Sequence, residues 1–354
     1  MNPIIEQDIK AIVKRNINWN LFSRRTVLIS GASGFIATYL VETLMYLNAY
    51  KNFSIRVLAV VRNKNKAVSK FSRHLKSKQL SLIIQDICEP LKIREKIDYI
   101  IHAASHASPK FYSSDPVGTL KPNITGTMNL LELARNKKVK GFLFMSSGEI
   151  YGSVVNAKKE ISETDYGFVD PMSLRSCYAE SKRMGEAICV SWYHQYGVPI
   201  KIVRLFHTYG PGMSLDDGRV HADFVANVVR GQDIVMKSEG KSLRTFCYIA
   251  DTVSAILTVL LKGRNGEVYN VGNNQAEIQI RELASLLSGI ISNKEIKVIK
   301  EMRKSGEKYI ESPIERCRPN IEKIKQLDWK PMYGLKDGFE RTILSYLTNI
   351  AGKA

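Results

Sequence analysis

The chain has 354 residues, of which 44% are hydrophobic and 24% are charged. This length allows one large folded unit or two smaller ones, and the composition excludes a disordered, collagen-like or disulfide-framed protein. A surplus of 52 basic over 34 acidic residues gives a net charge of +18, which favours an anionic partner. The basic residues are scattered and no nucleic-acid motif accompanies them, so a solvated surface or a phosphate-bearing small molecule fits better than nucleic acid.

The sequence carries no visible signal for membrane insertion, export or metal binding. No apolar run approaches the roughly 18 residues of a membrane span. Glu6 and Asp8 lie where an export signal would be basic and then apolar, which predicts a cytoplasmic protein. The cysteines are odd in number and form no C-x-x-C pair, which predicts buried thiols without a disulfide or a metal site. They are Cys88, Cys177, Cys189, Cys247 and Cys317.

Short β-branched runs alternate with helical patterns between residues 26 and 204. Strands are expected at 26–30, 55–61, 80–85, 99–102, 141–146 and 200–204, with helices at 36–47, 124–136 and 178–196. Continuously hydrophobic strands separated by helices indicate a parallel sheet that is covered on both faces. The fold class is therefore α/β, a Rossmann-like doubly wound parallel sheet.

The elements become shorter after residue 205. Helices are expected at 222–230, 251–261, 281–291 and 335–347, and a strand at 244–249. This pattern predicts a smaller C-terminal substrate-binding domain, made of residues 206–247 and 273–354. It would pack on a cofactor domain of residues 26–205 plus about 248–272. An amphipathic pattern at 4–17 predicts that residues 1–25 form a helical extension.

A glycine turn follows the first expected strand and leads directly into a helix. In this context the first glycine permits the bend and the second lets a pyrophosphate approach the N–H groups of the helix N-terminus. Ala37 keeps the third position small. We therefore expect a dinucleotide site rather than an ordinary strand-to-helix turn. The expected cofactor contacts are Gly31, Ser33, Gly34, Phe35 and Ile36.

Arg62 ends the second expected strand, where many dinucleotide sites have an acid. An acid there holds the ribose hydroxyls of NAD, whereas a base accepts the 2′-phosphate of NADP. The residue favours NADP(H) over NAD(H), although a solvated loop charge would give the same sequence.

Tyr178 and Lys182 are four residues apart on one helical face. A tyrosine with a pKa of about 10 can exchange protons near neutrality only if its phenolate is stabilised, and a fixed ammonium one turn away can do this. Ser147 ends an expected strand, where active-site groups of doubly wound sheets gather. These three side chains are candidate catalytic groups.

Taken together, these residues resemble the extended short-chain dehydrogenase/reductase family, in its branch of nucleotide-sugar epimerases, dehydratases, decarboxylases and reductases. The resemblance runs from Thr26 onward. Further matching segments are Asp86-Ile87, His102-Ala103-Ala104, Asn123 to Thr127, Ser146 to Gly152, Arg204 to Pro211 and Arg244 to Phe246. The resemblance also implies a homodimer.

The resemblance implies roles for the matched positions. Tyr178 would exchange the proton of a sugar hydroxyl, Lys182 would bind the nicotinamide ribose, and Ser147 would steady the sugar oxygen. Arg244 would meet the diphosphate of a nucleotide sugar. Further cofactor contacts would be Asp86, Ile87, Ala103, Ala104, Ser105 and Asn123.

Two positions depart from the family pattern. His207 replaces an asparagine that usually lies beside the substrate phosphates, although a core or surface histidine is the plainer reading. Gly148 replaces the aspartate with which 4,6-dehydratases protonate the leaving hydroxyl, which disfavours simple dehydration. Glu149 is kept, as in dehydratases and uronate decarboxylases, where it serves as a base or orients the substrate.

The leading expectation is an NADPH-dependent reductase of a nucleotide-linked 4-keto-6-deoxy sugar, for surface polysaccharide precursor synthesis. It depends mainly on Arg62. A UDP-glucuronate-type decarboxylase or an epimerase, with retained NAD, is the alternative that Glu149 keeps open. A binding protein that kept the fold without the chemistry is a third reading, against which the intact Ser147, Tyr178 and Lys182 argue.

Overall fold

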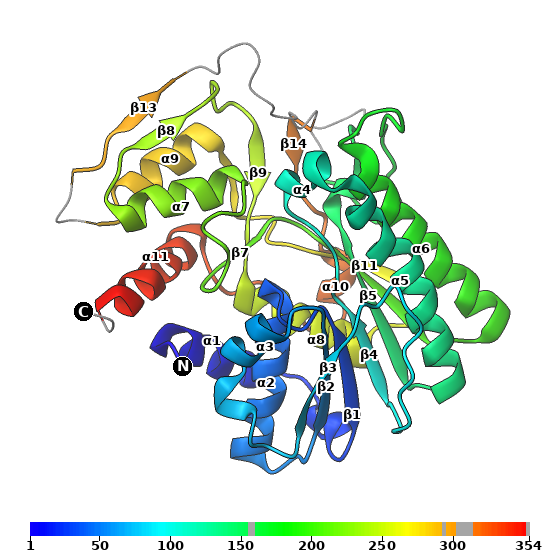
Figure 1. Ribbon diagram of the computed structural model, residues 1–354. Helices are drawn as coiled ribbons and strands as arrows, with labels where there is room; N and C mark the ends of the chain where they lie inside the picture. Colours follow the sequence, from blue (N-terminus) through cyan, green and yellow to red (C-terminus); the bar gives the residue numbers. More distant parts are fainter. Residues whose placement is uncertain (155–159, 292–294, 302–313, 352–354) are drawn as a thin grey trace.

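A seven-stranded parallel sheet forms the centre of the molecule (Figure 1). The computed structural model describes residues 1–154, 160–291, 295–301 and 314–351. The strand order is β3-β2-β1-β4-β5-β6-β11, which is the doubly wound order in which ligands bind beyond the carboxyl ends of the strands. The strands are β1 (Thr26–Ser30), β2 (Arg56–Val61), β3 (Leu80–Ile84), β4 (Tyr99–His102), β5 (Gly141–Ser147), β6 (Ile200–Leu205) and β11 (Glu267–Val271).

Alternate residues of each strand belong to different apolar cores. In β1, Val27 and Ile29 join one cluster of buried residues, while Leu28 joins the other. Side chains alternate across a strand, so the two clusters lie on opposite faces of the sheet. Both faces are therefore buried, which explains the continuous hydrophobic runs in the sequence.

Two helix pairs cover the two faces. Helices α2 (Phe35–Lys51) and α8 (Ile249–Lys262) pack on one face, and α5 (Pro116–Lys137) and α6 (Ser176–Tyr196) pack on the other. Helix α5 begins eight residues earlier than expected, because Asp115 caps it by accepting a hydrogen bond from the Gly118 N–H at 2.9 Å. The expected start at 124 was therefore wrong. The helix continues through Pro122, whose carbonyl accepts from a ring nitrogen of His102.

Apart from α8 and β11, the elements beyond β6 lie outside the central sheet and its two helix pairs. The expected strand at 244–249 was wrong in extent, because the chain enters two different small sheets there and Ile249 already begins α8. Strand β11 was not expected, and it completes the central sheet beside β6. The helices are α7 (Val220–Arg230), α9 (Ile280–Ser288), α10 (Glu322–Lys325) and α11 (Leu335–Ala351). The strands are β7 (Thr208–Tyr209), β8 (Ile234–Met236), β9 (Leu243–Thr245), β10 (Cys247–Tyr248), β12 (Glu277–Gln279), β13 (Val298–Lys300) and β14 (Arg316–Cys317).

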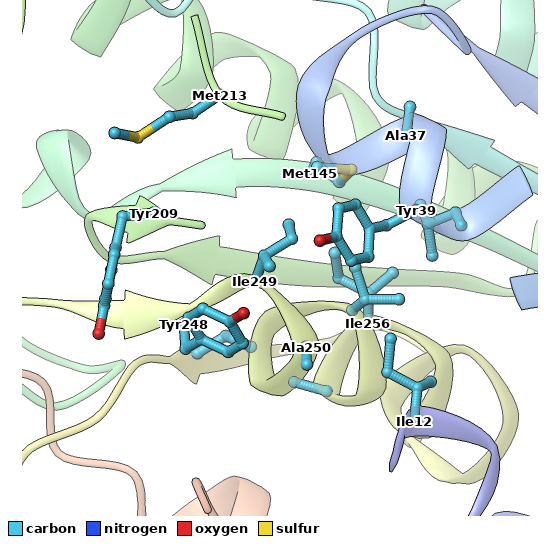
Figure 2. Close-up of a cluster of buried hydrophobic side chains, with 14 of the residues drawn as sticks. Ile12, Ala37, Tyr39, Met145, Tyr209, Met213, Tyr248, Ile249, Ala250 and Ile256 are labelled. Carbon is cyan, nitrogen blue, oxygen red and sulfur yellow. The ribbon is translucent and has the colours of Figure 1, made fainter. Parts of the chain in front are cut away.

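The N-terminal helix α1 (Pro3–Val13) ties the sheet layer to the C-terminal helix. It is shorter than the expected 4–17 pattern. Asp8 is fully buried, accepts hydrogen bonds from Tyr39 of α2 at 3.0 Å and Tyr248 at 2.8 Å, and pairs with Arg341 of α11 at 2.7 Å. Figure 2 shows Tyr39 and Tyr248 among the apolar side chains of the larger core.

Two further short helices are α3 (Lys64–Lys70), which follows β2, and α4 (Pro109–Ser114), which follows β4. Three-residue and four-residue 3-10 turns occur at Trp19–Phe22, Ser72–His74 and Gly148–Tyr151. In the part of the chain that the structure describes, no helix is both long and apolar enough to cross a bilayer. The cysteines are free, and Cys88 and Cys177 are half-buried rather than buried as expected.

Candidate active site

A cavity of about 290 Å³ lies beyond the carboxyl ends of β4, β5 and β6 and brings most of the candidate residues together. It begins at the N-terminus of α2 and passes Tyr178 and Lys182 before reaching residues after β6 and on β9. Eleven of the candidate residues line it: Gly34, Phe35, Ile36, Ala103, Ser105, Ser147, Glu149, Tyr178, Lys182, His207 and Arg244.

The glycine turn has the geometry that a dinucleotide requires. Gly31 has a φ of +63°, and a Cβ placed on it would lie 2.6 Å from the Cα of Ala104. The side-chain oxygens of Ser105 and Asn123 are buried and have no hydrogen-bond partner among the described residues. Ser105 follows the Ala104 that Gly31 approaches and lines the cavity, so its unsatisfied oxygen fits a bound polar ligand such as a dinucleotide.

Several expected cofactor residues lie outside the cavity lining. Ile87 is buried against Gly126 of α5, where an added Cβ would come within 2.5 Å of its side chain. Asn123 donates to the Ser181 hydroxyl at 2.9 Å, one residue before Lys182, so it helps to hold α6 in place. The set outside the lining is Gly31, Ser33, Arg62, Asp86, Ile87, Ala104 and Asn123.

Arg62 is exposed, and its guanidinium lies beside two other side chains. It lies 3.7 Å from a carboxylate oxygen of Asp86 and 2.8 Å from Nε2 of His106. Asp86 follows β3, the strand beside β2 in the sheet, so a carboxylate lies next to the arginine that follows β2. The two charges partly compensate each other.

Tyr178 and Lys182 are both buried, and burial shifts both pKa values toward the neutral forms. Burial raises the pKa of Tyr178 to about 12, against a hydrogen bond from Ser147 that lowers it. Burial lowers the pKa of Lys182 to about 7, against the charge of Glu186 that raises it. The ammonium donates to the Met145 carbonyl at 2.6 Å. The expected lowering of the Tyr178 pKa by Lys182 is therefore not seen here, because burial outweighs any stabilisation of the phenolate.

Two residues that the sequence analysis did not single out contact candidate catalytic side chains. Tyr112 of α4 stacks on Tyr178 with a centroid distance of 5.2 Å. Arg175 lies 5.8 Å from the centre of the Tyr112 ring and 3.3 Å from a carboxylate oxygen of Glu149. Arg175 precedes Tyr178 by three residues, which is a helical spacing that could have been noticed. Tyr112 gave no such signal because it is distant in sequence.

The cavity lining carries more positive than negative charge. Its described lining contains four basic side chains, Arg175, Lys182, Arg219 and Arg244, and one carboxylate, Glu149. Arg219 pairs with Asp217, and one of its nitrogens lies 3.0 Å from a carboxylate oxygen. Such a lining favours a ligand with several negative charges.

Gly148 leaves little room for a larger side chain. A Cβ placed on it would lie 3.2 Å from two carbons of the Phe206 ring, so that ring would have to shift to admit one. Gly148 itself has no side chain that could donate a proton. No set of three or more His, Cys, Asp or Glu side chains in the described ranges is placed to hold a metal ion.

A Rossmann sheet with a Tyr178–Lys182 pair at its carboxyl edge defines a short-chain dehydrogenase/reductase type of enzyme. The chain belongs to the NAD dependent epimerase/dehydratase family, whose model matches residues 27–272.

Curated relatives and solved structures agree with this assignment. The chain is 35% identical to UDP-glucuronic acid decarboxylase 5 of Arabidopsis thaliana, over 89% of this chain and 87% of the relative. It is 33% identical to UDP-glucuronic acid decarboxylase 1 of Xenopus tropicalis, over 90% of this chain and 72% of the relative. UDP-glucose 4-epimerase of Thermotoga maritima shares the fold, with a TM-score of 0.78 and 24% identity over 92% and 99% of the two chains. UDP-glucuronic acid 4-epimerase of Bacillus cereus, solved with UDP-glucuronic acid and NAD, also shares the fold. Its TM-score is 0.77 and its sequence identity is 23%, over 92% of this chain and 99% of that chain.

Proposed function

We propose that this enzyme decarboxylates a nucleotide-activated uronic acid, with UDP-glucuronic acid as the first candidate. The observation that carries the proposal is the strongly basic cavity, in which the Arg175–Glu149 pair lies beside Tyr178. A nucleotide uronate brings a diphosphate and a carboxylate, and a neutral sugar brings only the diphosphate. The curated relatives at 32–35% identity are decarboxylases of this type, and they give no support to a net reductase.

The chain's own groups account for the proton steps. Tyr178 starts as a phenolate that the Lys182 ammonium stabilises, and its Oη accepts the proton of the sugar C4 hydroxyl to become a neutral phenol. Ser147 orients the oxygen. A bound nicotinamide supplies acceptance and return of the C4 hydride. Beside a C4 ketone, the carboxylate carbon leaves as carbon dioxide while the bond electrons move toward the ketone. Glu149, which pairs with Arg175, positions the sugar or transfers the proton that C5 takes up after carbon dioxide leaves.

We infer that the retained cofactor is NAD(H) rather than the expected NADP(H). The Asp86 carboxylate beside Arg62 accepts from ribose hydroxyls and repels a 2′-phosphate. A reaction that returns its hydride also needs no fresh NADPH. The surface polysaccharide role, the cytoplasmic location, the homodimer and the domain boundaries at residues 25, 205 and about 248–272 stay proposals that rest on the sequence.

Incubation with UDP-glucuronic acid tests the proposal directly. Purified protein without added cofactor should release carbon dioxide and form a nucleotide pentose, which mass spectrometry detects. Tyr178→Phe serves as the control and should do neither. Conversion to a nucleotide hexuronate of unchanged mass would instead establish an epimerase. Consumption of NADPH with a nucleotide-linked 4-keto sugar, without carbon dioxide, would restore the reductase.

A further inference from the structure

Tyr112 of α4 packs directly on the candidate proton-transfer residue. Its ring stacks on Tyr178 with the centroids 5.2 Å apart and the planes inclined by 17°. Only 3% of Tyr112 is exposed, and its hydroxyl donates a hydrogen bond to the Ala107 carbonyl at 3.1 Å. A ring that is buried and bonded at its far end has little freedom to turn. Tyr112 is therefore a rigid surface against which the Tyr178 ring lies.

Helix α4 is itself held by the loop between β7 and α7. The Ser108 hydroxyl donates to the Asp217 carbonyl, 109 residues further along the chain. The Lys110 ammonium donates to the Asp216 carbonyl at 2.7 Å and to the Asp216 carboxylate at 2.9 Å. The Lys110 contact is at the surface, whereas Ser108 is buried. The position of Tyr112 consequently depends on a loop from the region beyond β6.

The angle of the Tyr178 ring matters for the rate because the reacting oxygen lies at the far end of that ring. Proton transfer requires Oη to lie within hydrogen-bond reach of the sugar oxygen. A misplacement of about 1 Å can cost on the order of a hundredfold in rate. Helix α6 fixes the Cα of Tyr178, but the side chain can still turn about its own bonds. Contact with a flat, fixed ring leaves fewer orientations open to it.

We propose that Tyr112 is a positioning residue that holds the Tyr178 ring at the angle required for proton transfer at the sugar C4 hydroxyl. The proposal rests on Tyr178 as the proton acceptor of the proposed function, and it applies whether or not loss of carbon dioxide follows. The nearly parallel ring of Tyr112 supplies the restraint, and its hydroxyl fixes that ring through Ala107. The ring, rather than the hydroxyl, should therefore determine the rate.

Tyr112→Met tests the ring, because methionine fills much of the same space with a flexible chain. NAD-loaded protein is mixed with UDP-glucuronic acid in a stopped-flow instrument, and the absorbance of the reduced nicotinamide reports oxidation at C4. The maximal rate should fall about tenfold to a hundredfold. The sugar concentration that gives half of this rate should change little, because the lost contact is to Tyr178 and not to the sugar. Tyr112→Phe keeps the ring and should retain most of the rate.

The matched control is Phe111→Met, which makes the same kind of change one residue earlier on α4. The Phe111 ring packs on His106 at 4.6 Å, so its replacement should leave the rate of C4 oxidation nearly unchanged. Thermal unfolding of both methionine variants shows whether lost packing alone alters the rate. Ser108→Ala is a second test, which keeps Tyr112 and releases α4 from the loop. Its rate should fall about twofold to tenfold, the range that one hydrogen bond contributes.

Several results would overturn the positioning role. The rate could be unchanged in Tyr112→Met, or fall equally in Phe111→Met. An equal loss in Tyr112→Phe would assign the effect to the hydroxyl, and a raised half-saturating concentration with an unchanged maximal rate would make Tyr112 a substrate contact. If Tyr112→Met does not fold, an unchanged rate in Ser108→Ala overturns the proposal by itself. The proposed function fails separately if wild-type protein oxidises C4 but releases no carbon dioxide.

Discussion

Helix α6 carries two buried polar clusters one turn apart, and their hydrogen bonds are completed in different ways. Glu186 accepts from Arg204 at 2.7 Å and from Ser146 at 2.5 Å, and Arg204 also donates to Tyr151 at 2.8 Å. One turn earlier, Lys182 and its neighbours face a cavity. A cluster whose polar groups all bond to protein fixes the structure, whereas one that faces open space is available for a ligand. We therefore expect the Glu186 cluster to contribute to stability and the Lys182 side of the same helix to contribute to chemistry.

Tyr178→Phe should cause the largest effect on the cavity side. It removes the exchangeable proton and little packing, so turnover should fall by about a hundredfold to ten-thousandfold. Unfolding midpoint and cofactor affinity should stay near wild type. Steady-state rates, cofactor titration and thermal unfolding check this. Retention of more than about a tenth of the rate would remove Tyr178 from proton transfer.

Arg204→Met should instead lower stability and leave the rate nearly unchanged. It leaves the Glu186 carboxylate buried without its partner, so stability should fall by about 3–5 kcal/mol, measured by urea unfolding. The rate per folded molecule should change little. Arg135→Met is the matched control, since Arg135 pairs with Glu132 at an exposed site and should cost less than about 1 kcal/mol. Equal losses in the two variants would contradict the structural role assigned to the Arg204 cluster.

Glu149→Gln tests whether the cavity carboxylate does more than orient the sugar. If Glu149 handles a proton, the rate should fall on the order of a hundredfold with stability nearly unchanged. Glu180→Gln on the surface of α6 serves as the comparison variant. A loss of only a few-fold would assign Glu149 to positioning the sugar and remove it from proton transfer.

Arg62 and Asp86 form a third, exposed pair for which we expect the smallest effect. Asp86→Asn should remove the repulsion and strengthen NADP binding, and Arg62→Asp should weaken it by roughly tenfold to a hundredfold, since a charge-assisted hydrogen bond contributes about 1.5 to 3 kcal/mol. Titration of NAD and NADP against both variants and wild type measures this. If unmutated protein binds NADP more tightly than NAD, the attraction of the 2′-phosphate to Arg62 exceeds its repulsion by Asp86, and the inference of retained NAD fails.

The parts of the molecule predicted from sequence are those set by local periodicity. The strands around Val27 and the helices that carry Tyr178 and Lys182 lie close to their expected positions. The early start of α5 depended on the Asp115 cap, and the break between β9 and β10 depended on partners from distant strands. Long-range contacts also placed Tyr112 on Tyr178 and set Asp86, which the sequence had indicated, beside Arg62. Their sequence separation from the motifs carries no periodic signal.

The contacts of Asp8 have a consequence for the kinetics of substrate entry. This one carboxylate bonds to α2 and to α11, and α11 packs on α7, which begins at the cavity wall. The two sides of the cleft cannot swing apart without exposing or unpairing a buried charge, which is costly. Substrate should thus diffuse into a cleft that is already shaped. Stopped-flow binding should show one phase whose rate rises linearly with ligand concentration, without the plateau that a slow closure step would impose.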